Sequence, residues 1–150
     1  MTTDTVTCSL PGLPESARAA RELTAACLAG CPAAADAVLC ADELVANAVR
    51  HSRSGLPGGT VTVRVTVAAG EWLRVDVEDA GPLAAVPAPR AALDEGGRGL
   101  MLVVALADVF GADAATGRRW FSMPWDPSVP VPLAPAWLLA ELLDSPAGAR

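Results

Sequence analysis

Residues 43 to 52 read E-L-V-A-N-A-V-R-H-S, a run that is apolar except for a few polar side chains and its terminal serine. The Ala, Val and Leu residues around them predict a helix over residues 35–53, ended by the Ser-Gly pair that follows. The polar side chains belong to Glu43, Asn47, Arg50 and His51. At about 100° per residue, the first three fall in one narrow stripe of the helix, with the histidine beside it.

This polar stripe has two interpretations. Taken singly, each residue fits an ordinary solvated helix face. Apolar neighbours such as Leu44, Val45 and Val49 leave little room for a wholly exposed face, however, and favour the wall of a pocket. The residue types then suggest a chemistry, because a carboxylate can take a proton, an amide oxygen suits Mg²⁺, and a guanidinium fits phosphate oxygens.

Composition limits the classes of function. The chain has 150 residues, which fits one domain, and a net charge of -6 with no lysine, so that arginine supplies all eleven Lys/Arg positions. This acidic balance argues against binding nucleic acid, which needs a basic surface. No uncharged run approaches the roughly 18 to 20 residues that span a bilayer, and the first residues lack the order of a signal peptide. We therefore expect a soluble, cytoplasmic protein without a membrane partner, and buried, reduced thiols for the four Cys.

The hydrophobic periodicity predicts an α+β fold. Residues 60–67 and 72–79 alternate at period two and predict a hairpin. The expected strands are residues 4–10, 60–67, 72–79 and two around Gly111 and Gly117, and the expected helices are residues 14–28, 35–53 and 99–106. This order predicts a two-layer sandwich in which helices cover one face of a mostly antiparallel sheet. Residues 82–96 are Pro-rich and predict a loop or lid.

Two further motifs add to the polar stripe. The second hairpin strand ends in V-E-D-A-G-P, where the Asp79 carboxylate can accept from an exocyclic amine and Gly81 lets a ligand approach the backbone. Residues 96–103, G-G-R-G-L-M-L-V, open an apolar helix, and glycines before a helix N-terminus expose N–H groups that suit phosphates. An Asp-x-Gly turn and a glycine cluster are each common in proteins, so neither is specific alone.

The order of these motifs resembles a known family. E-x-x-x-N on a helix, D-x-G after a hairpin, a Pro-rich lid and G-x-G at a helix start resemble the Bergerat fold, the ATP-binding domain of the gyrase and histidine-kinase superfamily. Within it, E-L-V-A-N-A-V-R-H-S and G-G-R-G-L look like the anti-sigma-factor serine kinases. The resemblance covers roughly residues 4–125, and residues 126–150 are expected to form a Pro/Ala-rich tail with a short C-terminal helix.

The resemblance implies a role for each group. It implies that ATP and Mg²⁺ are the cofactors, that Asn47 holds the metal and that Glu43 is the general base. Asp79 would accept from the adenine amine with Gly81 beside it. The remaining expected nucleotide-binding residues are Arg50, His51, Gly97, Arg98, Gly99 and Leu100.

The resemblance also implies partners and leaves alternatives open. A kinase of this type phosphorylates a Ser or Thr of an antagonist protein and otherwise binds a sigma factor. The alternatives are an ATP-binding regulatory module without phosphoryl transfer and, third, the detached catalytic half of a histidine kinase. Many relatives read D-x-G-x-G, whereas Leu83 replaces the second glycine here and Pro82 stiffens the start of the lid. The oligomeric state is open, a homodimer included.

Overall fold

The computed structural model describes residues 2–83, 97–113 and 115–129. The strands are β1 (Asp4–Pro11), β2 (Thr60–Ala68), β3 (Trp72–Glu78), β4 (Val109–Asp113) and β5 (Arg118–Pro124). The helices are α1 (Ser16–Cys27), α2 (Ala34–His51), the short 3₁₀ helix η1 (Arg53–Gly55) and α4 (Gly97–Leu106). Each predicted element from residue 4 to residue 124 is present in the predicted order. Most of the predicted lid and the predicted C-terminal helix lie outside the described residues.

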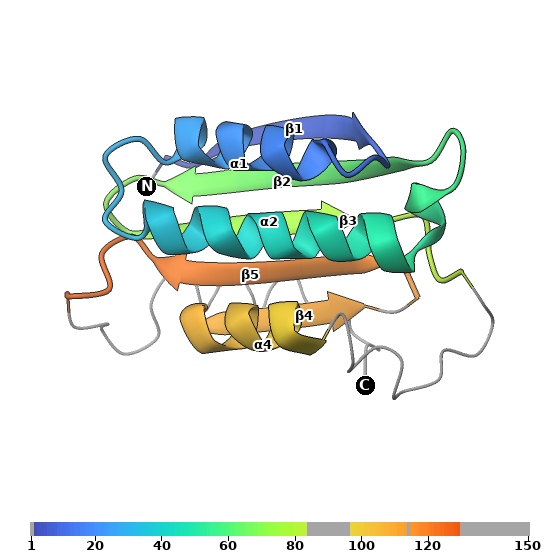
Figure 1. Cartoon of the computed structure of the whole chain (residues 1–150). Helices are drawn as coiled ribbons and strands as arrows, with labels where there is room; N and C mark the ends of the chain where they lie inside the picture. The colour runs from blue at the N-terminus through green and yellow to red at the C-terminus, as the bar shows by residue number, and fades with distance from the viewer. Residues whose placement is uncertain (1, 84–96, 114, 130–150) are drawn as a thin grey trace.

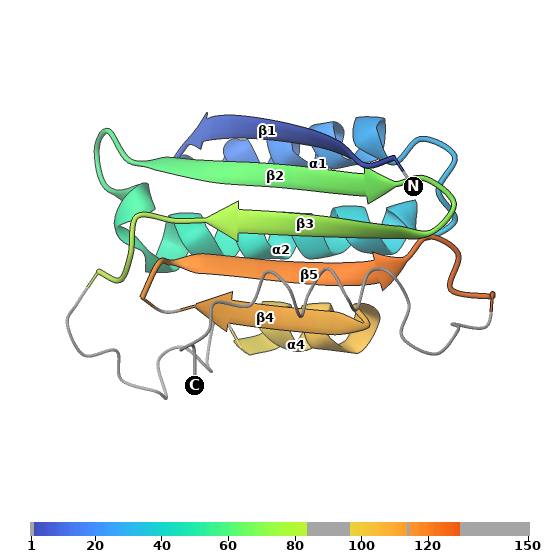
Figure 2. The same cartoon turned by 180° about the vertical axis from the view of Figure 1, so that it is seen from behind.

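The strands form one antiparallel sheet in the order β1-β2-β3-β5-β4. The α-helices α1, α2 and α4 lie on one face of this sheet, with α2 between the other two (Figure 1). Seen from behind, the strands face the viewer with these helices beyond them (Figure 2). The predicted two-layer α+β sandwich is thus confirmed.

The core lies between the sheet and the helices because the strands alternate. In β3, Leu73, Val75 and Val77 are buried against the helix layer, while the residues between them point to the other face. The core side chains contributed by the other central strands are Val61, Val63, Val65, Phe121 and Met123. Burying one such Val, Leu or Phe side chain stabilises the fold by about 1.5–3 kcal/mol.

Helix α2 ends two residues earlier than its periodicity predicts. Ser52 adopts an extended conformation, and its Oγ donates to the carbonyl of Ala48 at 2.6 Å and accepts from the Ser54 backbone N–H at 3.0 Å. A serine that bonds the backbone in this way competes with the helix. The chain therefore leaves α2 at His51 and makes the single turn η1. Residues of η1 bond the turn that follows β3.

The four Cys are free thiols with different environments. Cys31 and Cys40 are buried as expected, whereas Cys8 and Cys27 are only half-buried, so for these two the expectation was wrong. Burial, followed by the nearby charges of Asp36 and Glu43, raises the pKa of Cys40 to about 12. Cys40 is therefore held as the unreactive thiol at neutral pH.

Candidate functional site

The polar stripe of α2 runs from the half-buried Glu43 to the exposed Arg50. Between them, Asn47 is only 4% exposed and lies on the same buried side of the helix as Leu44 and Ala48. His51 is half-buried at the last residue of the helix. The stripe is therefore not a uniformly solvated face, since its amide is placed among core residues.

Asn47 carries a buried amide oxygen. Its Oδ1 has no hydrogen-bond partner within the described part of the chain, and the same holds for Nε2 of His51. A buried polar atom without a partner costs about 1–3 kcal/mol, so such atoms are rare in native proteins. A hard amide oxygen in this position fits Mg²⁺, as the sequence predicts. The residues present are therefore compatible with that metal.

The start of α4 lies directly against Glu43. Helices α2 and α4 are in contact, and a Cβ added at Gly99 would overlap Oε2 of Glu43. Only glycine at this position leaves space for the carboxylate beside the first turn of α4. Two predicted site motifs that are more than forty residues apart in the sequence thus meet in the fold.

The first turn of α4 contains the other predicted glycine-motif residues. The helix begins at Gly97, so its unpaired N–H groups belong to the predicted phosphate-binding residues. Leu100 is half-buried and packs against the core, which anchors this end of the helix. Arg98 lies in the same turn of the backbone.

Asp79 follows β3 and is held in a fixed orientation. Its side chain is 7% exposed, its Oδ1 accepts from the Gly81 N–H at 2.8 Å, and its Oδ2 lies 3.5 Å from Nη1 of Arg119. Gly117 is also required here, because a Cβ on it would overlap Oδ1 of Asp79. A carboxylate has about four acceptor positions, so these contacts leave room for a donor from a ligand.

The turn after Asp79 is joined to the end of α2 by residues that the sequence interpretation missed. The Arg53 side chain donates to the Ala80 carbonyl from Nε at 3.0 Å and Nη2 at 2.6 Å, and its backbone N–H donates to the Gly81 carbonyl at 2.8 Å. Ser54 Oγ accepts from the Ala80 N–H at 2.8 Å. These bonds fix the Asp79 turn relative to the helix that carries Asn47. The only sequence signal was their position directly after the polar stripe.

Comparison with known proteins identifies the domain. The family of histidine kinase-like ATPase domains matches residues 10–125, which include the α2 stripe, the Asp79 turn and the start of α4.

The chain belongs to this family.

Membership implies that the domain binds ATP, and it confirms the superfamily expected from the motifs. No curated protein matches the chain, so its finer specificity rests on the residues themselves. Among the helices that the structure describes, none is long and apolar enough to cross a membrane.

The Gly99→Ala variant tests the contact between α2 and α4 in this ATPase domain. Alanine favours a helix over glycine by about 1 kcal/mol, and the overlapping atom is the end of a flexible side chain. We therefore expect unchanged or slightly higher thermal stability. A displaced Glu43 should nevertheless lower any phosphoryl transfer by up to about 100-fold. The control is Ala105→Gly at an exposed position of α4, which should lower stability and leave transfer unchanged.

The Arg53→Ala variant tests the connection between α2 and the Asp79 turn. Arg53 is exposed, so each lost bond is expected to be worth only about 0.5–1.5 kcal/mol. We expect ATP affinity to fall about threefold to tenfold, measured by calorimetry. Arg18→Ala, which removes an exposed arginine from α1, is the control. Equal affinities for Arg53→Ala and wild type would show that the turn holds its position without this side chain.

Proposed function

We propose that this domain is an ATP- and Mg²⁺-dependent serine/threonine protein kinase of the anti-sigma-factor type. It would regulate a sigma factor by phosphorylating a Ser or Thr of a small antagonist protein. The observation that supports this proposal best is the pairing on α2: a carboxylate beside the start of α4 and, one turn later, a buried amide oxygen that has no partner among the described residues. Phosphoryl transfer needs mainly a base, a metal and positioned donors, and this arrangement offers a candidate for each.

Each role in the reaction falls to a different residue. Glu43 takes the proton from the partner's hydroxyl as its oxygen forms a bond to the γ-phosphorus, and the bond from that phosphorus to the β,γ-bridging oxygen breaks, so ADP leaves. The N–H groups at the start of α4 and the guanidinium of Arg50 bind phosphate oxygens. Asn47 would hold Mg²⁺, which supplies charge neutralisation at the phosphates when bound. The Asp79 carboxylate selects adenine by accepting from its amine.

A second candidate is a module that binds ATP without transferring phosphate. Leu83, in place of a second glycine, and Pro82 alter the start of the lid. Pro82 also pairs with Ser52 through a β-bridge, so the chain is tied to the end of α2 at this point. A lid that closes less completely would still allow binding, because the proposed adenine and metal ligands lie outside the lid.

The deciding experiment is incubation of the full chain with γ-labelled ATP, Mg²⁺ and candidate antagonist proteins from the same genome. The kinase proposal expects label on one antagonist, and replacement of the acceptor Ser or Thr by Ala should remove it. If ATP binds but no antagonist is labelled, the binding-module alternative is correct and the kinase proposal fails.

The Asn47→Ala variant separates the metal role from the nucleotide role. We expect ATP binding to lose its enhancement by Mg²⁺, while the fold remains intact because Ala favours a helix and no described bond of the Oδ1 is lost. Calorimetry with and without Mg²⁺ measures the first effect, and a thermal melt without ligand measures the second. Melting far below wild type would mean that Asn47 is a structural amide of the core.

A further inference from the structure

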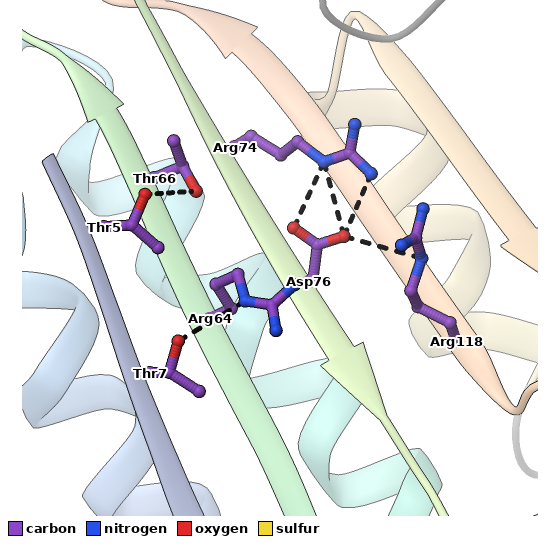
Figure 3. Close-up of polar contacts among 7 residues, drawn as sticks. All are labelled: Thr5, Thr7, Arg64, Thr66, Arg74, Asp76 and Arg118. Atoms are coloured by element: carbon purple, nitrogen blue, oxygen red, sulfur yellow. Dashed lines mark hydrogen bonds and ion pairs between the residues drawn. The ribbon is translucent and has the colours of Figure 1, made fainter. Parts of the chain in front are cut away.

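The sheet has a second face, opposite to the helices, whose central side chains come from β3 and β5. We call it the outer face, and its central residues are Trp72, Arg74, Asp76, Trp120 and Ser122. Strand alternation places them there, since their neighbours Leu73, Val75, Val77 and Phe121 point into the core. Figure 3 shows part of this face, with Arg64 and Thr66 from β2 beside the central residues.

The outer face is buried, although no described helix covers it. Its five central residues are only 1–7% exposed. The α-helices that the structure describes all lie on the opposite side (Figures 1 and 2). Neighbours within a sheet cover the flanks of such side chains but not their outward ends, which normally reach water. These exposed fractions are those of the single chain, so the cover must come from parts of the same chain outside the described residues.

The chemistry of the outer face defines what can cover it. Arg74 donates to both oxygens of Asp76, at 3.0 and 3.1 Å for its closest contacts, and Arg118 Nε lies 3.7 Å from the same carboxylate (Figure 3). The guanidinium groups of Arg74 and Arg118 lie 5.3 and 4.9 Å from the centre of the Trp120 ring. Together, the guanidinium groups of Arg74 and Arg118 and the carboxylate of Asp76 carry a net positive charge. A complementary cover would present negative charge.

The outer face also offers hydrogen-bond donors. Nε1 of Trp72 and Nε1 of Trp120 are buried, and neither has an acceptor among the residues that the structure describes. A buried Trp N–H usually finds a partner, so the missing acceptors belong to whatever covers the face. Pro-rich segments are suited to this task, because prolines supply carbonyl acceptors without N–H donors and such segments bind to aromatic surfaces.

The chain's own C-terminus has the matching composition. Residues 130–135 read P-V-P-L-A-P, and residues 136–144 read A-W-L-L-A-E-L-L-D, which combine carbonyl acceptors, apolar side chains and two carboxylates. The segment begins a few residues after β5, the strand that carries Trp120. Fully extended, residues 130–150 could span about 70 Å, several times the length of a seven-residue strand. A tethered segment also has a higher effective concentration than a separate molecule.

We propose that residues 130–150 dock on the outer face, with the Pro-rich part accepting from the tryptophan N–H groups and Glu141 or Asp144 facing the arginines. The docked segment replaces water over the polar cluster of β3 and β5, and it is independent of nucleotide binding on the helix side. The outer face of the intact chain is then closed to protein partners, which must use other surfaces.

Nuclear magnetic resonance on the intact chain tests this directly. We expect nuclear Overhauser contacts between side chains of residues 130–135 and the indoles of Trp72 and Trp120, unchanged on dilution. A mixture of isotope-labelled and unlabelled chains distinguishes contacts within one chain from those between copies. Absence of these contacts would overturn the proposal. So would contacts seen only between copies, or only after a partner protein is added.

A variant provides a second, independent readout. Replacing Leu138, Leu139, Leu142 and Leu143 by Ser should speed exchange of the Trp72 and Trp120 indole protons with water at least tenfold, with ATP affinity unchanged. The matched control replaces Leu39 and Leu56 by Ser in the same way. These two residues are 41% and 50% exposed, and their replacement should leave both indoles protected. Indole protection that survives the tail substitutions would contradict the proposal. If the tail variant does not fold, the contacts in the intact chain decide.

Discussion

The Asp79→Asn variant is expected to bind ATP about 10- to 150-fold more weakly than wild type, which corresponds to the loss of about 1.5–3 kcal/mol for a hydrogen bond to a charged group. Asn keeps the shape of the side chain and an oxygen for the Gly81 N–H. It replaces the second carboxylate oxygen by an NH₂ group, which cannot accept from the adenine amine. Calorimetric titration of both proteins with ATP measures the difference.

The ion pair with Arg119 calls for a control. Asp79 Oδ2 lies 3.5 Å from Arg119 Nη1, so Asp79→Asn also removes an ionic contact. Arg119→Gln removes the same contact and leaves the carboxylate in place. We expect this variant to bind ATP at least as well as wild type, since the carboxylate gains an acceptor position. A loss as large as that of Asp79→Asn would assign the effect to the ion pair and not to adenine recognition.

The Glu43→Gln variant is expected to lose phosphoryl transfer by about 10²- to 10⁴-fold, the usual contribution of a positioned general base. Its ATP affinity should stay nearly unchanged, because Gln fills the same space beside Gly99 and a base contributes little to binding of the ground state. Single-turnover transfer of labelled phosphate to the antagonist protein measures the rate. Glu22→Gln, at an exposed position of α1, is the matched control. If Glu43→Gln transfers phosphate at the wild-type rate, Glu43 is not the general base.

The strands and helices could be predicted because their patterns are local. The alternation of β2 and β3 and the buried face of α2 follow directly from residue type, and the observed bounds differ from the predicted ones by about two residues. The end of α2 was placed too late because the Ser52 side chain, and not the periodicity, decides where the helix stops. Such side-chain competition leaves only a weak trace in the sequence.

The candidate site residues were predicted from their motifs, whereas the contacts that connect them were not. The motifs indicated Glu43, Asp79 and Gly99, but the overlap of Gly99 with Glu43 depends on how α4 packs on α2. The bonds from Arg53 to Ala80 and the ion pair from Arg119 to Asp79 join segments that are far apart in the chain. Nothing in a local pattern specifies such pairs, because they arise only when β3, β5 and η1 are assembled.

The outer face shows the same limit of local patterns. Arg74 and Asp76 alternate with core residues in β3, and this pattern is typical of a strand with one face in water. Both side chains are nevertheless buried. Their burial depends on cover from beyond the strand, which the alternation cannot reveal.

Titration of the full chain with ATP, with and without Mg²⁺ and with GTP as the comparison nucleotide, tests the central claim most directly. The claim is that α2, the Asp79 turn and the start of α4 form one ATP and magnesium site. We predict one ATP bound per chain, tighter binding with Mg²⁺, and clearly weaker binding of GTP, whose ring presents a carbonyl where adenine has its amine. No binding of ATP, or GTP bound as tightly as ATP, would contradict the claim.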